Sequence, residues 1–222
     1  MTSKIVVSLS GGMDSATVLR WVLRKPDTEA ICVNFIYGSK HNTYENKAAM
    51  AIAEFYDQPL IELDIEGVMC GFKSDLLKSG GAIPEGHYTD VSMEQTIVPA
   101  RNIIFASILA GIAWSNKAGA VALGIHQGDH AIYPDCRPAF FNMMNQAIKI
   151  GTNYNVNLLA PFLNGNKIDI AAWGLANKVP YHLTRTCYKD QPVACGKCGS
   201  CVERLAAFTQ LGRTDPIVYE RG

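Results

Sequence analysis

The strongest constraint on the fold is the regular alternation of strand-like and helix-like segments along the chain. Short apolar runs suited to buried strands alternate with longer segments of helical periodicity. The predicted strands span residues 4–9, 29–35, 60–65, 120–124 and 157–161, and the predicted helices span residues 15–24, 42–56, 102–117, 140–151 and 168–178. Strict alternation predicts an α/β fold, with a doubly wound, Rossmann-like parallel sheet covered by helices on both faces. Between residues 67 and 96 the pattern loosens, which indicates an insertion or lid.

The turn after the first predicted strand carries a phosphate-binding pattern. The six residues Ser-Gly-Gly-Met-Asp-Ser, from Ser10 to Ser15, follow directly on the apolar run 5–9. Glycines let the backbone turn tightly, and free amide hydrogens at a helix start point at an anion with help from the helix dipole. The alternative is a turn that binds no ligand and in which Ser10 caps the helix. In an open parallel sheet, ligands bind beyond the carboxyl ends of the strands, which is where this loop lies.

Two familiar nucleotide motifs are missing from this loop. It lacks the Gly-Lys-Ser/Thr ending of a Walker loop, which supplies a lysine to the terminal phosphates and a hydroxyl to magnesium. It also lacks the Gly-x-Gly-x-x-Gly pattern of dinucleotide-binding folds. The loop therefore predicts a phosphate site of another kind.

Cysteines cluster near the C-terminus. Four of the seven cysteines are Cys187, Cys195, Cys198 and Cys201, with glycines between the last three. Four converging thiolates suit a closed, structural zinc ion. Two alternatives stay open at this stage: an iron–sulfur site, because cysteines recur at two-residue gaps, and a redox pair, because Cys-x-x-Cys occurs twice.

Composition bounds the class of protein. The chain has 222 residues, 48% of them hydrophobic, with 20 basic and 20 acidic side chains, so no overall charge draws it to nucleic acid. No stretch reaches the roughly twenty apolar residues of a membrane span, and the N-terminus has no apolar signal core. We expect a cytoplasmic protein without a direct nucleic-acid or membrane partner. It is predicted to consist of an α/β domain over residues 1–180 and a zinc-binding, C-terminal helical region over residues 181–222.

A second polar segment follows the predicted strand at 120–124. It contains Asp129, Tyr133, Asp135 and Arg137. An acid can accept paired hydrogen bonds from a guanine-like edge, and an arginine can bind a carboxylate through two hydrogen bonds. The segment therefore suits a flat polar ligand, with a solvated, proline-containing loop as the alternative.

Taken in order, these motifs resemble one family. The Ser10–Ser15 loop, followed by residues 37–41, 98–102 and 133–138 and then by the four cysteines, resembles the QueC or ExsB family of N-type ATP pyrophosphatases, which makes the queuosine and archaeosine precursor. The Ser10–Ser15 loop by itself is also found in many ligases and tRNA-thiolating enzymes. The sequence Tyr-Pro-Asp-Cys-Arg followed by four cysteines is specific to far fewer proteins. One departure is Val-Pro-Ala-Arg where the family usually has Val-Pro-Gly-Arg, so Ala100 either avoids a positive φ or accepts strain. Another is the pair of histidines His126 and His130, at positions where the family more often has other polar residues.

The resemblance implies an activity, cofactors and a fold of the adenine nucleotide alpha hydrolase type. The activity is ATP-dependent conversion of 7-carboxy-7-deazaguanine and ammonia to 7-cyano-7-deazaguanine (preQ0) by a ligase, with magnesium, a structural zinc and a homodimer. The alternatives are a tRNA-thiolating ATP pyrophosphatase and a related ligase acting on another purine.

The resemblance also implies roles for individual residues. ATP is assigned to Leu9, Ser10, Gly11, Gly12, Met13, Asp14 and Ser15, with Asp14 at the magnesium. Catalysis is assigned to Asp14, Ser15 and Arg101. The deazaguanine is assigned to Arg101, Asn102, Asp129, Tyr133, Asp135 and Arg137. Lys167 is a weaker candidate for phosphate charge, with a solvated lysine as the alternative.

Overall fold

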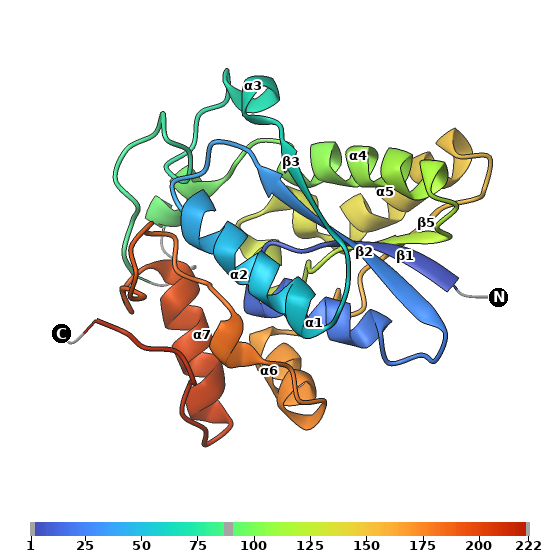
Figure 1. Cartoon of the computed structure of the whole chain (residues 1–222). Helices are drawn as coiled ribbons and strands as arrows, with labels where there is room; N and C mark the ends of the chain where they lie inside the picture. The colour runs from blue at the N-terminus through green and yellow to red at the C-terminus, as the bar shows by residue number, and fades with distance from the viewer. Residues whose placement is uncertain (1–2, 87–90, 221–222) are drawn as a thin grey trace.

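A five-stranded parallel sheet forms the centre of the molecule. The computed structural model describes residues 3–86 and 91–220. The strands are β1 (Ser3–Ser8), β2 (Thr28–Ile36), β3 (Leu60–Asp64), β4 (Ala120–Ala122) and β5 (Asn157–Leu159). They lie in the order β3-β2-β1-β4-β5, and every neighbouring pair is parallel (Figure 1). The chain winds outward from β1 in both directions, which confirms the predicted doubly wound α/β fold.

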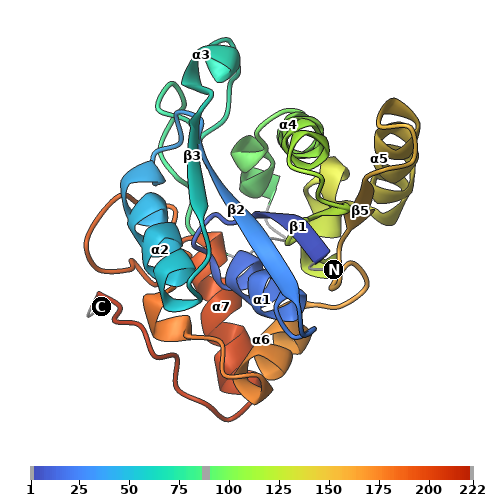
Figure 2. The same ribbon diagram turned by 45° about the vertical axis from the view of Figure 1, so that its right-hand side comes forward.

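Helices cover both faces of the sheet. They are α1 (Met13–Val22), α2 (Asn42–Phe55), α3 (Glu66–Met69), α4 (Arg101–Ser115), α5 (Pro138–Gly151), α6 (Lys167–Ala176) and α7 (Gly199–Gln210). Figure 2 shows α1, α2, α6 and α7 on one side and α4 and α5 on the other. Each strand and helix predicted from periodicity is present, with ends that differ by no more than two residues.

The two faces of the strands supply two separate cores. Successive residues of a strand point to opposite faces, so Val6 and Val33 join the core beneath α4 and α5, whereas Val7 and Cys32 join the core beneath α1 and α2. Because both faces are covered, the strands are continuously apolar rather than alternating. The two cores hold the carboxyl ends of the strands in fixed positions around the first loop.

The segment predicted as an insertion or lid packs onto the rest of the molecule where it is described. Met69, Leu76, Leu77 and Met93 are buried in the core on the α4 side. Further along, the backbone N–H of Gly86 donates to the carbonyl of Lys197 in the cysteine region. Residues 67–86 and 91–96 therefore connect the α4 core to the cysteine region.

The C-terminal region returns to the helical layer beneath α1. Tyr181 and Phe208 are buried in the same core as α1. A buried ion pair between Arg204 Nε and Asp215 Oδ2, 2.7 Å long, holds the last residues against α7. The division at residue 180 stays a prediction.

One described stretch, Met93–Ser115, is long and apolar enough to cross a membrane by composition alone. Its helical part is α4, which packs along β1 and β4 and contributes Phe105, Ala106 and Leu109 to the core. The side chains that α4 turns toward the sheet contribute to the apolar character of the stretch.

Candidate active site

The carboxyl ends of the strands surround one large cavity. It encloses about 1070 Å³, including its open mouth. Its walls come from the loops after β1, β2, β4 and β5, together with the first residues of α4 and the cysteine region.

The loop after β1 presents an uncapped helix N-terminus to this cavity. No side chain caps α1, although Ser10 Oγ lies 3.3 Å from the backbone nitrogen of Gly12 and 3.2 Å from Ser15 Oγ. Gly11 has φ +84°, and a Cβ there would lie 2.5 Å from the carbonyl oxygen of Glu45. Glycine is therefore required for the loop to lie against α2. The result is a set of N–H and hydroxyl donors facing the cavity, as an anion site needs.

Asp14, in the first turn of α1, lies beside a buried lysine. Lys167 Nζ is 2.6 Å from Asp14 Oδ2 and 3.2 Å from Glu203 Oε2. Burial alone would raise the pKa of Asp14, but Lys167 and His126 outweigh burial and hold that pKa below its usual value. Asp14 Oδ1 is buried without a hydrogen-bond partner among the described residues. The structure thus makes Lys167 a member of the site.

His126 connects this cluster to the loop after β4. It is fully buried, and its Nδ1 accepts a hydrogen bond from the backbone N–H of Gly128 at 3.0 Å. Its Nε2 lies 3.8 Å from Asp14 Oδ2 and 3.5 Å from Asp129 Oδ2. The histidine therefore lies between the two carboxylates that line the cavity here.

Arg101 lies at the aromatic side of the cavity. Burial alone would lower its pKa, but Tyr37, Tyr188 and Tyr133 outweigh burial and raise the pKa well above its usual value. The Tyr133 hydroxyl is 2.8 Å from Thr96 Oγ1, which fixes the ring. A permanently charged guanidinium surrounded by phenols suits a flat anionic ligand.

Beside Arg101 lies a histidine–glutamate pair. His41 Nε2 is 3.4 Å from Glu45 Oε2. Burial, followed by the charge of Arg101, lowers the pKa of His41 to about 3. Burial also raises the pKa of Glu45 to about 8, against the opposing charges of Arg101 and Arg185. Both groups are therefore neutral near pH 7, with His41 as imidazole and Glu45 as the protonated acid.

The structure brings most, but not all, of the predicted site residues to the cavity. Those lining it are Ser10, Gly12, Met13, Asp14, Ser15, Arg101, Asn102, Asp129 and Tyr133. Leu9 and Gly11 do not line it: Leu9 is buried in the core with its carbonyl bonded to Asn34, and the Gly11 carbonyl accepts from the backbone N–H of Arg185.

Two residues assigned to the heterocycle also lie outside the cavity lining. Asp135 Oδ2 accepts from the backbone N–H of Asn102 at 2.8 Å, so this carboxylate serves the start of α4. Arg137 is exposed, and its guanidinium is directed at the carbonyl of Ala131 at 3.5 Å. The position of each follows from the short helical turn Pro134–Cys136, which sequence reasoning did not predict.

Several lining residues carried no assigned role in the sequence-based prediction. They are Tyr37, His41, Glu45, Arg185 and Tyr188. Tyr37 and His41 belong to the motif at residues 37–41, but no local pattern showed that both would be buried at the cavity. Glu203 was not predicted at all.

Ala100, immediately before α4, has the strained backbone conformation, which was one of the two predicted alternatives. It has φ 55° and ψ 20°, in the left-handed region. An alanine side chain disfavours this conformation, whereas glycine adopts it freely.

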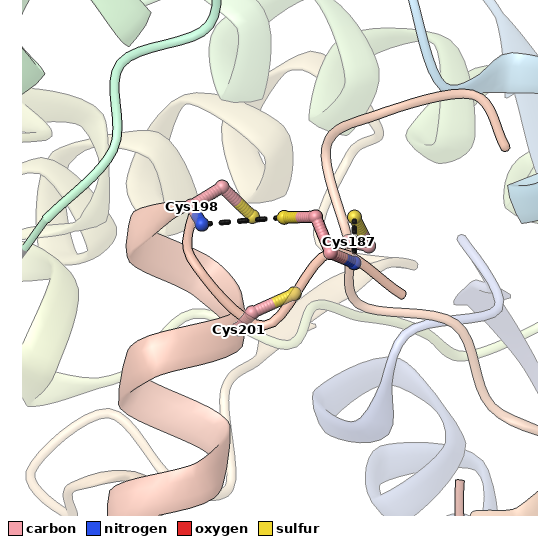
Figure 3. A group of neighbouring side chains, drawn as sticks. Cys187, Cys198 and Cys201 are labelled. Carbon is pink, nitrogen blue, oxygen red and sulfur yellow. Dashed lines mark hydrogen bonds between the residues drawn. The ribbon is translucent and has the colours of Figure 1, made fainter. Parts of the chain in front are cut away.

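The four cysteines form a closed cluster at the start of α7. Their sulfur atoms lie within 4.8 Å of one another, and all four residues are buried. Figure 3 shows the sulfur atoms of Cys187, Cys198 and Cys201 turned toward one another. Backbone N–H groups of Lys189 and Cys195 point at Cys187 Sγ, at 3.4 and 3.3 Å. Such donors stabilise thiolates, the form that binds a metal ion.

The fold and the site define a class: doubly wound α/β proteins in which an uncapped helix N-terminus after the first strand lies at a cavity. Within that class, residues 4–212 match the family described as "Queuosine biosynthesis protein QueC". The chain belongs to the QueC family.

Curated relatives cover nearly the whole chain. The 7-cyano-7-deazaguanine synthase of Pseudoalteromonas translucida is 43% identical over 99% of this chain and 100% of the relative. The relative of the same name from Caldicellulosiruptor saccharolyticus is 43% identical over 98% of this chain and 96% of the relative.

A solved structure shares the fold at low identity. It is the U34-tRNA thiolase NcsA from Methanococcus maripaludis with its [4Fe-4S] cluster, with a TM-score of 0.52 and 14% identity over 95% of this chain and 66% of that one. This likeness supports the α/β architecture alone.

Proposed function

We propose that this chain converts 7-carboxy-7-deazaguanine and ammonia to 7-cyano-7-deazaguanine in two ATP-dependent rounds at one site. Membership of the QueC family supports the product. The observation that carries the ATP-dependent step is the uncapped N-terminus of α1, with Asp14 and Lys167 2.6 Å apart beside it. This arrangement offers amide donors, a carboxylate and an ammonium to a polyphosphate.

The chemistry begins with activation of a poor electrophile. An oxygen of the substrate carboxylate attacks the α-phosphorus of ATP, which expels pyrophosphate and leaves an acyl adenylate. Ammonia then attacks the carbonyl carbon, AMP departs with that oxygen, and an amide remains. A second ATP takes the amide oxygen in the same way, and loss of AMP and a proton gives the nitrile.

The protein contributes mainly position and charge to these steps. Donors of the Ser10–Ser15 loop hold the departing pyrophosphate, and Lys167 offsets the charge that develops on it. Arg101 pairs with the substrate carboxylate. Tyr133 and Asp129 contact the heterocycle, and the protonated carboxyl of Glu45 is a further polar group beside the heterocycle.

The cluster around Asp14 suits magnesium. Asp14 Oδ1 is a buried carboxylate oxygen without a hydrogen-bond partner among the described residues, and Asp129 faces it across His126. Hard oxygen ligands of this kind are those that magnesium prefers. When bound, magnesium supplies neutralisation of phosphate charge.

The cysteine cluster suits a single zinc ion. Tetrahedral zinc with bonds of about 2.3 Å to sulfur places its ligands about 3.8 Å apart. The sulfur spacing here, within 4.8 Å, agrees with one ion at the centre. A [4Fe–4S] cluster carries each cysteine on a separate iron and needs a wider set of sulfur atoms. When bound, zinc holds the loop at 187–198 to α7.

An apolar face on α4 and α5 supports a homodimer. Ile103 and Trp114 lie on one stripe of α4, 45% and 51% exposed, and Met143 and Ile150 lie on one stripe of the adjacent α5, 68% and 66% exposed. This face is poor in charge, since α4 after Arg101 has none and α5 has only Lys149. Uncharged apolar faces are typical of permanent interfaces between copies. Light scattering at twice the monomer mass, reduced to monomer by Met143→Glu, tests the dimer.

The remaining expectations concern compartment and partners. Reduced cysteines that hold a metal fit the cytoplasm, where thiols are kept reduced. Twenty basic and twenty acidic residues offer no excess positive charge for RNA. We therefore propose a cytoplasmic enzyme whose substrates are small molecules.

Isotope transfer tests the proposed reaction. The protein is incubated with ATP, magnesium, ammonium and carboxylate-labelled (oxygen-18) substrate, and the products are analysed by mass spectrometry. We expect the nitrile, pyrophosphate and oxygen-18 in AMP. A nitrile formed without label in AMP would contradict adenylation of the substrate, and turnover of a tRNA instead would support the thiolating alternative.

A further inference from the structure

Helix α7 carries a side chain from the cysteine cluster to Lys167, which lines the cavity. Its first turn contains Cys201, and Glu203 follows two residues later. Glu203 Oε2 reaches to 3.2 Å from Lys167 Nζ, while that ammonium lies 2.6 Å from Asp14 Oδ2. The Lys167 side chain is 7% exposed, so these two carboxylates largely replace water around it. Two elements far apart in sequence thus fix one ammonium from two sides.

The loop after β4 is shaped to admit the glutamate. A Cβ on Gly128 would lie 2.6 Å from Glu203 Oε1 and 2.8 Å from His126 Cε1. Both distances are shorter than real Cβ contacts. Gly128 therefore allows Glu203 to lie against the loop, while its N–H orients His126 toward Asp14 and Asp129.

Glu203 changes how Lys167 interacts with Asp14. With Asp14 as its sole acidic partner, the ammonium would pair fully with that carboxylate and compete with a magnesium ion for it. A second carboxylate, 3.2 Å from the ammonium, shares it with Asp14, which contacts Lys167 through Oδ2, so that the Oδ1 atom of Asp14 stays available to a cation. The ammonium is held at the mouth of the phosphate loop, ordered before substrate arrives.

We propose that Glu203 is a positioning residue for Lys167. It holds the Lys167 ammonium where the pyrophosphate departs, and α7 transmits its position from the cysteine cluster. The inference rests on the proposed function, because it takes the phosphates of ATP to lie beside Lys167. Glu203 itself is not among the residues that line the cavity.

A double-mutant cycle tests whether Glu203 acts through Lys167. The variants are Glu203→Gln, Lys167→Met and the two combined, with Glu54→Gln, an exposed glutamate of α2, as the matched control. Pyrophosphate release should fall by about 10- to 100-fold in Glu203→Gln, as for residues that orient a functional group. KM for the carboxy-deazaguanine and the melting temperature should stay unchanged. The double variant should be no slower than Lys167→Met, because a positioning residue has nothing left to position.

Three results would overturn the proposal. The first is full activity of Glu203→Gln. The second is a double variant that is slower than Lys167→Met by the whole factor lost in Glu203→Gln. The third is a loss of activity in Glu203→Gln that is accompanied by a fall in melting temperature. The charge-retaining variant Glu203→Asp gives a further check, since it should recover part of the activity lost in Glu203→Gln.

A binding measurement separates this inference from the proposed reaction. The same cycle is repeated by calorimetry with inorganic pyrophosphate and magnesium, which requires no turnover. Weaker pyrophosphate binding in Glu203→Gln, absent on the Lys167→Met background, supports the positioning role even if the wild type forms no nitrile. Unchanged binding in an enzyme that does form the nitrile would contradict the role of Glu203 alone.

Discussion

The cysteine cluster and the acid–lysine cluster at the cavity each take one side chain from the start of α7, Cys201 and Glu203, yet they are built in opposite ways. The cysteines are at most 1% exposed, and backbone N–H groups point at Cys187 and Cys195 sulfur atoms. At the cavity, Asp14 is 24% exposed and its Oδ1 has no hydrogen-bond partner among the described residues. Satisfied, closed groups indicate a structural role, whereas buried groups left unsatisfied indicate a site for a ligand.

The difference predicts that changes in the two regions separate activity from stability. Replacing Asp14 should stop the chemistry and leave the fold intact. Replacing a cysteine should weaken the fold first and reduce activity as a consequence.

The largest effect is expected for Asp14→Ala. Loss of this carboxylate removes the proposed magnesium ligand and the partner of Lys167, so pyrophosphate release should fall by about 1000-fold or more, equivalent to roughly 4 kcal/mol. The free energy of unfolding should change by less than about 1 kcal/mol, because Glu203 still pairs with Lys167 and one of three neighbouring carboxylates is gone. Rates come from a coupled pyrophosphate assay and stability from urea unfolding.

The control is Asp27→Asn, an exposed turn residue at the opposite ends of the strands. Undiminished pyrophosphate release in Asp14→Ala would remove Asp14 from the site. A large loss of stability would instead mean that the cavity cluster supports the fold as the cysteines do.

Cys198→Ser should give the reverse pattern. Without this ligand the metal is lost, and the loop at 187–198 is released from α7. The free energy of unfolding should fall by about 3 kcal/mol. Metal content by mass spectrometry should fall with it, and Cys70→Ser, at an exposed cysteine outside the cluster, serves as the control. Normal metal content and stability in Cys198→Ser would rule out a structural metal.

The two regions also differ in how far local sequence patterns reveal them. Cysteine spacing and the Ser10–Ser15 loop are local patterns, so the position of each site follows from the sequence, as do the strands and helices from their periodicity. Lys167 lies 153 residues from Asp14 and Glu203 a further 36 on. Contacts of that range depend on how α6 and α7 pack beneath α1, which no local pattern specifies. Arg137, predicted at the heterocycle, lies outside the cavity lining for a similar reason, because the short turn at Pro134–Cys136 decides which side chains face the cavity.

A pH dependence of stability should mark the cavity region. The pKa of Glu45 rises to about 8 in the folded protein from an ordinary value of 4.5. The folded state therefore keeps a proton that the unfolded state releases, so the contribution of Glu45 to the free energy of unfolding should fall as pH rises from about 4.5 to 8, by up to about 1.4 kcal/mol per pH unit. His41, Arg101, Arg185 and Asp190 face this group. His41 acts in the opposite direction between about pH 3 and 6.5, because burial lowers its pKa to about 3 from an ordinary value of 6.5, so the net fall is expected between about pH 6.5 and 8.

Glu45→Gln, which stays neutral, isolates this contribution. Urea unfolding from about pH 6.5 to 8 should show a flatter profile for the variant than for the wild type. Parallel profiles would mean that Glu45 is ionised in the folded protein and that this side of the cavity carries an additional negative charge.

The smallest expected effect concerns the strained backbone at the cavity edge. Ala100 has φ 55°, a conformation that costs a residue with a side chain about 1 kcal/mol relative to glycine. Ala100→Gly should therefore raise the free energy of unfolding by somewhat less than about 1 kcal/mol, since the unfolded chain also gains freedom. Ala118→Gly, at a buried loop position without a positive φ, should destabilise the protein and is the control. Because Arg101 follows directly, stabilisation with unchanged KM for the carboxy-deazaguanine would show that the strain is incidental to Arg101. A rise in KM would show that the strained alanine holds the Arg101 guanidinium in place. The cavity would then differ from the cysteine cluster in two respects, its unsatisfied polar atoms and its strained backbone.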